Sequence, residues 1–265
     1  MFVYRVTNMR ITIKVGTSTL THSTGRLNIR HVEELCKVIS DVKNAGHEVV
    51  LVSSGAIGMG VGKLNLSSRP TDMPTKQAAA AVGQCELMYV YDKLFAEFNH
   101  TVAQILLTGE DMRDNARHRN FTNTLHRLLV LGALPVINEN DTVSTDEIAV
   151  GDNDTLSALV AVSIEADLLI VLTDIDGLYT ADPRKEADAC LISEVREITP
   201  ALLAGAGGGG TALSTGGMAT KLSAAKLCMD AGTDMIIVNG EKPGVIYDVL
   251  EGKSLGTRFI GRKAT

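Results

Sequence analysis

Two lysines stand next to glycine-rich segments and together indicate a binding site for an anion. Lys14 lies at the end of an apolar stretch, residues 10–15, and Gly16 follows two residues later. Lys221 follows the glycine-rich residues 205–217, in the expected first turn of a helix, where the helix dipole disfavours a cation unless an anion is near. A nucleotide phosphate would serve, because lysine ammonium and backbone N–H groups bind phosphate together. A solvated lysine and a flexible glycine loop are the alternatives.

A second glycine-rich segment, residues 55–62, follows an apolar stretch that ends in Ser53 and Ser54. The dinucleotide motif G-x-G-x-x-G is not met, because the run is G-x-G-x-G with Lys63 where the last glycine should stand. The P-loop motif is not met either, because Ile57 takes its first glycine position and Leu64 follows Lys63. The segment therefore predicts a turn into a helix whose N–H groups hold phosphate or carboxylate, with a plain tight turn as the alternative.

Residues 138–154 are acidic and contain no basic residue. Their acids are Glu139, Asp141, Asp146, Glu147, Asp152 and Asp154. A solvated acidic loop is the ordinary explanation of such a stretch. Here Asn138 ends a buried strand and Asn153 opens a helix, and these positions favour capture of an ammonium group or the positioning of nearby lysines. The register of an EF-hand calcium loop is absent.

Apolar periodicity predicts strands and helices in alternation. Strands are expected at residues 10–15, 48–52, 102–107, 134–138, 168–172 and 235–238. Helices are expected between Asn28 and Gly46 and at residues 75–98, 121–131, 153–164 and 218–231, with a possible hairpin at 143–150. This order is typical of βαβ units, so the fold class is α/β with a parallel sheet covered by helices on both faces. Ligands bind such sheets at the carboxyl ends of the strands, where the candidate residues lie.

Composition limits the classes of protein. The chain has 265 residues, is 45% hydrophobic and carries a formal charge of −6, so it can bury a large core and is neither disordered nor built to bind nucleic acid. No apolar run is long enough to cross a membrane, and the opening residues lack the apolar region that is expected of a secretory signal. Widely spaced cysteines predict reduced, buried thiols and a cytoplasmic protein. One domain is expected, with approximate lobes at residues 10–165 and 166–262.

Taken in order, the segments that carry these candidates resemble the amino-acid kinase family over residues 10–259. They are Ile13-Lys14-Val15-Gly16-Thr17-Ser18, Ser53-Ser54-Gly55-Ala56-Ile57, Pro135-Val136-Ile137-Asn138-Glu139-Asn140-Asp141, Gly151-Asp152-Asn153-Asp154, Leu172-Thr173-Asp174, Gly177-Leu178-Tyr179-Thr180-Ala181-Asp182-Pro183 and Thr215-Gly216-Gly217-Met218-Ala219-Thr220-Lys221. No single segment is specific, but seven in this order are. The resemblance implies the carbamate kinase-like fold, a three-layer αβα sandwich with a central, mostly parallel sheet.

Residues 137–141 and 151–154 resemble the branch of the family that phosphorylates the side-chain carboxylate of L-glutamate with ATP, the first step of proline synthesis. The resemblance implies that Lys14 and Lys221 contact the transferring phosphoryl group and that Asp154 holds both lysines in place. Residues implied to bind glutamate are Ser54, Gly55, Asn138, Asp141, Asp152 and Asn153. Residues implied to surround ATP are Lys14, Gly16, Thr173, Asp174, Thr215, Gly216, Gly217, Met218, Ala219, Thr220 and Lys221.

The resemblance further implies Mg²⁺ bound with ATP, no metal-ligating side chain, inhibition by proline, and assembly into a homodimer or homotetramer. Family members often carry a C-terminal PUA-like domain that this chain is expected to lack, and Ser214 stands where a glycine is usual. Three alternatives stay open. They are a sister kinase acting on aspartate, acetylglutamate, carbamate or a nucleoside monophosphate, a nicotinamide-dependent oxidoreductase, and a non-catalytic metabolite sensor.

Overall fold

The computed structural model describes residues 8–22, 26–143, 153–181, 183, 186, 188–205 and 217–262. Its strands form one sheet in the order β3-β4-β2-β1-β5-β7-β8-β6. The strands are β1 (Arg10–Val15), β2 (Glu48–Ser53), β3 (Val102–Leu107), β4 (Leu134–Glu139), β5 (Leu168–Thr173), β6 (Glu194–Val195), β7 (Asp234–Asn239) and β8 (Thr257–Phe259). All neighbouring pairs are parallel except β7 and β8, which are antiparallel. The mostly parallel sheet is therefore confirmed.

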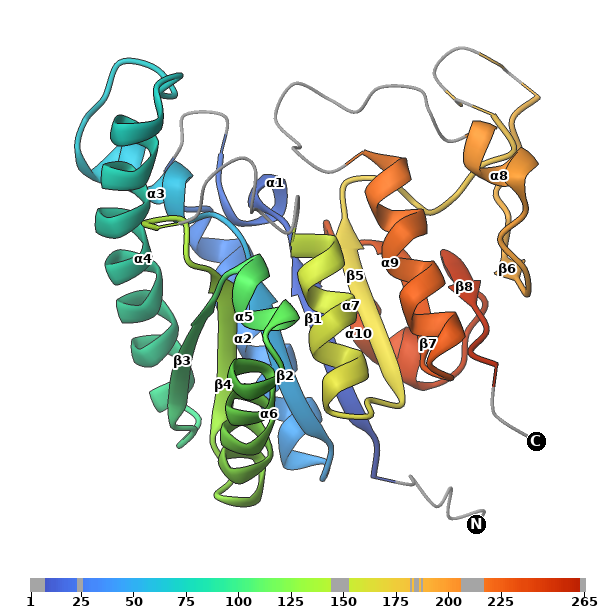
Figure 1. The fold of residues 1–265 in the computed structure, drawn as a ribbon, viewed down its shortest axis with the longest axis horizontal. Helices are drawn as coiled ribbons and strands as arrows, with labels where there is room; N and C mark the ends of the chain where they lie inside the picture. The colour runs from blue at the N-terminus through green and yellow to red at the C-terminus, as the bar shows by residue number, and fades with distance from the viewer. Residues whose placement is uncertain are drawn as a thin grey trace.

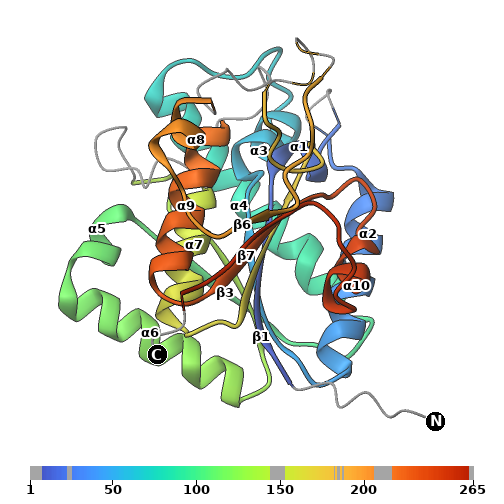
Figure 2. The ribbon, with the colours of Figure 1, turned by 90° about the vertical axis from the view of Figure 1, so that its right-hand side faces the viewer.

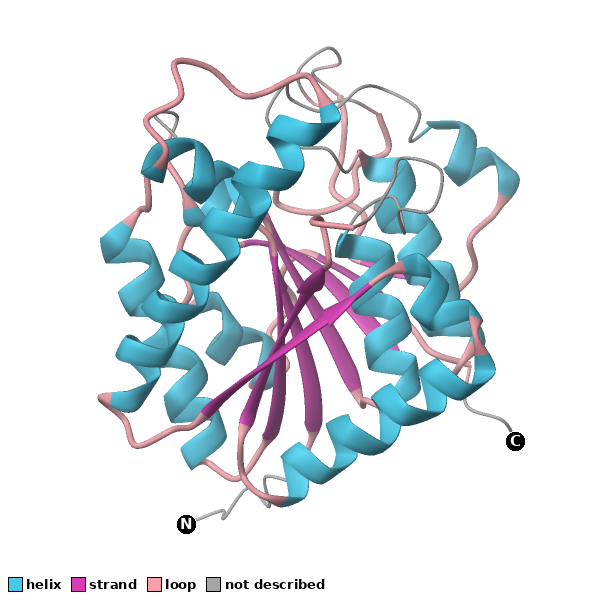
Figure 3. Ribbon diagram, turned by 60° about the vertical axis from the view of Figure 1, so that its left-hand side comes forward, coloured by secondary structure: helices cyan, strands magenta, loops and turns pink. Residues whose placement is uncertain are grey.

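Helices cover both faces of this sheet. They are α1 (Thr17–Leu20), α2 (Ile29–Asn44), α3 (Ala56–Lys63), α4 (Met73–Ala96), α5 (Gly109–Arg113), α6 (Asn115–Val130), α7 (Asn153–Ser163), α8 (Pro200–Gly205), α9 (Met218–Asp230) and α10 (Val245–Leu250). Figure 1 shows α6, α7 and α9 in front of the sheet, and Figure 2 shows α2 and α10 on its opposite side. Seen along another direction, the strands are enclosed between helices (Figure 3), as expected of a three-layer αβα sandwich.

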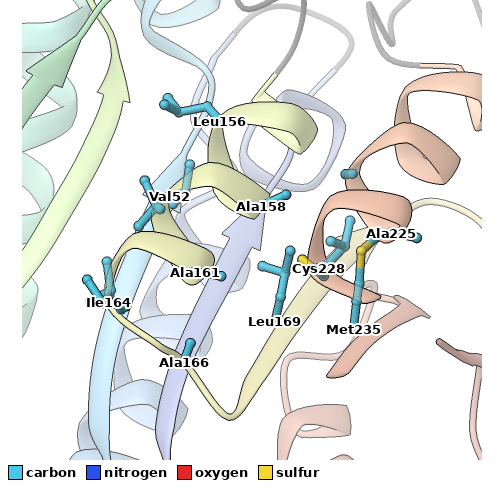
Figure 4. Packing of buried hydrophobic residues seen from close by; sticks show 14 of the residues in the cluster. Val52, Leu156, Ala158, Ala161, Ile164, Ala166, Leu169, Ala225, Cys228 and Met235 are labelled. Carbon is cyan, nitrogen blue, oxygen red and sulfur yellow. The ribbon is translucent and has the colours of Figure 1, made fainter. Parts of the chain in front are cut away.

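Two apolar cores fill the spaces between the sheet and the two helical layers. One joins α2, α4 and α10 to one face of the sheet, and the other joins α6, α7 and α9 to the opposite face. In Figure 4, Cys228 of α9 lies close to Leu169 of β5 and Met235 of β7. Because both faces of β5 are covered, all of its residues are buried, which explains why its sequence is continuously apolar.

Local sequence signals account for the positions of the long helices. The side chain of Asn28 accepts a hydrogen bond from the backbone N–H of His31 and begins α2, as predicted. The predicted start of α6 was wrong, because Asp114 caps the helix by accepting from the N–H groups of Ala116 and Arg117. The short elements α1, α5, α8, α10, β6 and β8 were not predicted, because each has too few residues to show a period. The expected hairpin at 143–150 lies largely outside the described residues.

Helices α3 and α4 approach each other closely because both have glycines at the crossing. A Cβ atom on Gly83 would lie 1.7 Å from the carbonyl oxygen of Ala56, and one on Gly60 would lie 1.8 Å from that of Ala79. Any side chain at either position would push the helices apart. These contacts fix α4 against α3, the helix that follows β2.

The prediction of buried thiols was only half right. Cys36 and Cys228 are buried, whereas Cys85 and Cys190 are exposed. Among the described residues, no helix is both long and apolar enough to span a membrane.

Candidate active site

The candidate residues gather where the chain changes direction across the sheet. Strand β1 pairs with β2 on one side and with β5 on the other, so the chain extends from β1 towards one edge and later from β5 towards the other edge. The carboxyl ends of parallel strands on either side of such a point are where ligands bind. Lys14 is opposite Val52 and Val171 in the register of the sheet, close to the ends of all three strands.

The charged part of the site consists of two lysines that form ion pairs with the same carboxylate. The Nζ atom of Lys14 lies 2.6 Å from Oδ1 of Asp154, and that of Lys221 lies 3.0 Å from Oδ2. Asp154 is completely buried and each lysine is 5% exposed. Charges are buried only when they are paired, so these contacts offset part of the cost of burying the three side chains. The group carries one net positive charge.

Each member of this group comes from a different element. Lys14 is on β1, Asp154 is in the first turn of α7, and Lys221 is in the first turn of α9. The dipole of α7 favours the negative charge of Asp154, whereas the dipole of α9 disfavours the positive charge of Lys221. The sequence indicated that Lys221 needs an anionic partner, and Asp154 is an anionic partner within the protein itself.

The first turn of α9 adds polar groups around these lysines. The hydroxyl of Thr220 lies 3.2 Å from Oδ2 of Asp154 and 2.8 Å from the carbonyl oxygen of Gly217. Met218 and Ala219 are the first two residues of the helix, whose opening backbone N–H groups have no partner within the helix itself. Across the site, a Cβ atom on Gly16 would lie 3.7 Å from Nζ of Lys14. Gly16 and the first turn of α9 therefore both lie next to the group formed by Asp154 and the two lysines.

The uncharged part of the site is a chain of amide side chains. The Nδ2 group of Asn153 donates to Oγ of Ser54 at 2.7 Å and to Oδ1 of Asn138 at 2.9 Å. The Nδ2 group of Asn138 in turn donates to Oε1 of Gln84 at 2.9 Å. These bonds join α7, β4, α4 and the segment after β2. Since Asn153 and Asp154 are consecutive, the amide chain and the charged group share the first turn of α7.

The segment after β2 is shaped by one glycine and by one tyrosine. Gly55 has φ of +104°, a conformation that other residues rarely adopt, and it lets the chain turn from β2 into α3. Beneath this turn, the hydroxyls of Ser53 and Tyr91 are 2.8 Å apart in the core. Burial raises the pKa of the Tyr91 hydroxyl, which therefore stays neutral. Both features fix the position of Ser54.

Asp141 is a candidate for binding an ammonium group. Burial, reinforced by the charge of Glu139 and opposed by Arg69, raises the pKa of Asp141 to about 6. A carboxylate whose charge is disfavoured in this way gains from a cationic partner. The position of Asp141, shortly after β4, is close in sequence to Asn138.

The remaining sequence candidates lie at the end of β5 or outside the described residues. The hydroxyl of Thr173 donates to Oδ1 of Asp174 at 3.2 Å, and the carbonyl of Thr173 accepts from the N–H of Gly240 at 2.8 Å. Asp152, Thr215 and Gly216 lie outside the residues that the structure describes.

Two residues of this region were missed by the sequence analysis, Gln84 and Tyr91. Both lie on the buried stripe of α4, together with Ala80 and Leu87. A glutamine within an apolar helical stripe was a usable signal, because a buried amide requires partners. No such signal exists for Tyr91, since a tyrosine is common in apolar cores.

The chain belongs to the amino acid kinase family, whose model matches residues 9–239. It is 56% identical to a glutamate 5-kinase from Clostridium tetani over 249 residues, which cover 94% of this chain and 93% of that protein. It is 52% identical to a glutamate 5-kinase from Clostridium perfringens over 258 residues, with 96% of both chains covered. The fold is similar to that of carbamate kinase from Giardia lamblia bound to AMP-PNP, with a TM-score of 0.72, 18% identity, and 97% and 100% of the two chains covered.

Proposed function

We propose that this chain transfers the γ-phosphoryl group of ATP to the side-chain carboxylate of L-glutamate, giving L-glutamyl 5-phosphate and ADP in the first step of proline biosynthesis. The observation that carries the proposal is that the charged group and the amide chain meet in the first turn of α7. Its Asp154 binds the two lysines, and its neighbour Asn153 belongs to the amide chain. An anion-binding site for phosphate therefore adjoins a neutral hydrogen-bonding site for an amino acid. Relatives at 52–56% identity are glutamate 5-kinases, which supports this choice of substrate.

The reaction requires no general base. The attacking carboxylate has an ordinary pKa of about 4.3, so it is ionised at neutral pH. The difficulty is to bring two anions together, and catalysis is then positioning and charge neutralisation. In the proposal, Lys14 and Lys221 neutralise the transferring phosphoryl group from two sides, and Asp154 keeps both ammonium groups in place.

The other residues have supporting roles in this proposal. Ser54, Gly55, Asn138, Asp141, Asp152 and Asn153 bind glutamate, and the carboxylate of Asp141 suits its ammonium group. Gly16, Thr173, Asp174 and residues 215–220 surround ATP. Apart from Lys14 and Gly16, the proposal gives residues 10–165 to glutamate and residues 166–262 to the nucleotide.

Magnesium enters with the nucleotide. Among the described residues, no three histidine, cysteine, aspartate or glutamate side chains converge as a metal site. In the proposal, Mg²⁺ binds through the phosphates of ATP and keeps several waters, as it usually does in such sites. When bound, it supplies positive charge to the phosphate oxygens, in addition to that of the lysines.

The decisive experiment is to trap the acyl phosphate with hydroxylamine. With ATP, Mg²⁺ and glutamate we expect hydroxamate to form in step with ADP release, because hydroxylamine attacks an acyl phosphate but not a phosphate ester. Aspartate and acetylglutamate are each tested as the alternative substrate in a separate reaction. Faster hydroxamate formation with either of them, or ADP release without hydroxamate, would refute the proposal.

The proposal extends to proline, to assembly and to location. Proline is expected to compete with glutamate and to protect residues 138–154 from proteolysis, and unchanged cleavage at saturating proline would contradict this. A dimer or tetramer is expected in solution, which light scattering measures directly. The cytoplasm is the expected location.

A further inference from the structure

The hydrogen bonds between the amide side chains all run in the same donor-to-acceptor sense, and one backbone N–H group sets that sense. The backbone N–H of Glu139 can only donate, and it points at the side chain of Asn138 with a distance of 2.9 Å. The atom of Asn138 that it meets must therefore be the oxygen Oδ1. The Nδ2 group of Asn138 must then face Gln84, which has to present its own oxygen, Oε1, at 2.9 Å.

The same reasoning orients Asn153. Because Oδ1 of Asn138 is an acceptor, the group of Asn153 that meets it at 2.9 Å is Nδ2, a donor. The second hydrogen of that group is used by Oγ of Ser54 at 2.7 Å. Three amide side chains thus have no freedom to exchange oxygen and nitrogen by rotation.

This fixed direction leaves one polar atom without a protein partner at each end of the chain. Among the described residues, Nε2 of Gln84 and Oδ1 of Asn153 are buried and have no hydrogen-bond partner. Gln84 is 7% exposed and Asn153 is 9% exposed, so water reaches neither amide freely. Buried polar groups are nearly always bonded, so two such atoms on one chain require an explanation. One is a donor and the other an acceptor.

A free amino acid has the acceptor and the donor that complement these two atoms. Its ammonium group donates and its α-carboxylate accepts, which is the chemistry that the two ends of the chain lack. An ammonium group suits Oδ1 of Asn153, close to the acidic residues that follow β4. A carboxylate suits Nε2 of Gln84, because an amide N–H donates well to an anion without adding charge.

The fold holds Gln84 firmly in this position. It follows Gly83, where α4 touches α3 so closely that a Cβ atom would lie 1.7 Å from a carbonyl oxygen of α3. Its side chain extends from the buried stripe of α4 to the end of β4, where Asn138 holds its oxygen. A residue fixed at both backbone and side chain is preorganised for binding.

We propose that Gln84 binds the α-carboxylate of the amino-acid substrate through Nε2, with its amide oriented by Asn138. This inference rests on the proposed function and deepens it, since it assigns a specificity-determining contact within the glutamate site. The contact distinguishes an amino acid from a simple carboxylic acid or amine at the carbon that does not react.

Two substitutions separate a direct contact from a purely structural role. Gln84→Met removes both polar atoms, whereas Gln84→Glu keeps an oxygen for Asn138 and replaces the donor by a carboxylate oxygen. A direct contact predicts that both variants raise KM for glutamate by about tenfold or more, with KM for ATP changed less than twofold. Gln84→Glu should be at least as impaired as Gln84→Met, because its carboxylate repels that of the substrate.

Calorimetric titration of the same variants with glutamate and with 4-aminobutanoate completes the test. 4-Aminobutanoate is glutamate without its α-carboxylate, so its affinity should be the same in the wild type and in Gln84→Met, while that of glutamate falls about tenfold. Gln104→Met, at an exposed position on β3, is the matched control and should bind glutamate normally. Near-normal KM for glutamate in Gln84→Glu, or an equal loss of both ligands in Gln84→Met, would overturn the proposal. A wild-type protein that forms no hydroxamate from glutamate would instead refute the proposed function.

Discussion

The candidate site has a charged half and a neutral half, and different interactions hold each of them together. The charged half consists of Lys14, Asp154 and Lys221, whose ions are buried with one another. The neutral half consists of Ser54, Asn153, Asn138 and Gln84, joined by hydrogen bonds without any net charge. In the charged half, attraction between opposite charges offsets a large desolvation penalty. In the neutral half each bond contributes little, and its value lies in direction.

This difference suits the two ligands. A phosphoryl group that is being transferred gains from positive charge on several sides, so strength matters more than direction. An amino acid must be distinguished from similar small molecules, and fixed donors and acceptors achieve this, because a wrong substrate leaves them unpaired. We therefore expect substitutions in the charged half to lower kcat, and substitutions in the neutral half to raise KM for glutamate.

The largest effect is expected from Asp154→Asn. The substitution keeps the shape of the side chain but leaves two buried lysines without their anion. Loss of one partner of a buried pair costs about 3–5 kcal/mol of stability, and misplaced lysines should lower kcat about 1,000-fold. Thermal unfolding and ADP release measure the two effects.

Asp230→Asn is the control for Asp154→Asn, because it breaks the exposed pair with Lys226 at 2.8 Å and should leave both measurements unchanged. A melting temperature and kcat close to wild type in Asp154→Asn would mean that the lysines need no carboxylate between them.

Replacing a single lysine should act on turnover. In Lys14→Met and Lys221→Met, Asp154 keeps its ion pair with the other lysine, so the protein should still fold. If the lysines neutralise the phosphoryl group as proposed, the lost charge should lower kcat about 100-fold while KM for glutamate changes less than threefold. Lys63→Met, which removes an exposed lysine paired with Glu86, is the control. If KM rather than kcat changes, the charged half binds substrate and the comparison fails.

The glutamate side should respond to pH through Asp141. Its pKa is raised to about 6, so it loses its charge as the pH falls below that value and then no longer attracts the substrate ammonium. KM for glutamate should rise up to about tenfold per pH unit below pH 6, while the reacting carboxylate, with a pKa of about 4.3, stays ionised.

Initial rates between pH 5 and pH 8 test this dependence on Asp141. Asp141→Asn should have a high KM for glutamate that no longer changes over this range. The same pH profile in this variant as in the wild type would exclude Asp141 as its source.

The smallest effect is expected from Tyr91→Phe. It removes the hydroxyl that bonds Ser53 beneath Ser54 but leaves the apolar ring in place. One buried hydrogen bond is worth about 1 kcal/mol, and the Ser53 hydroxyl can still donate to the carbonyl of Ser54. Chemical denaturation should show this loss, with KM for glutamate changed less than threefold. A large rise in KM would mean that Tyr91 belongs to the neutral half.

The sequence predicted the long elements, and it singled out most of the residues that meet at the candidate site, for identifiable reasons. Strand β5 is continuously apolar and α2 begins at a capping asparagine, and both signals are local. Lys14 and Lys221 were recognised because each stands beside glycines. The short α3 was indicated only as a helix start, because its glycines obscure any period.

The sequence by itself determined the alternation of strands and helices and the residue types at the strand ends, because periodicity and turn chemistry act over a few neighbouring residues. Only the tertiary structure decided which of these residues meet. Lys221 and Asp154 are 67 positions apart, and Asn153 and Ser54 are 99 positions apart. Such contacts depend on strand order and helix crossing, which no local pattern encodes. The orientation of the Gln84 side chain on α4 is the clearest case, because it follows from the backbone N–H of Glu139 on β4.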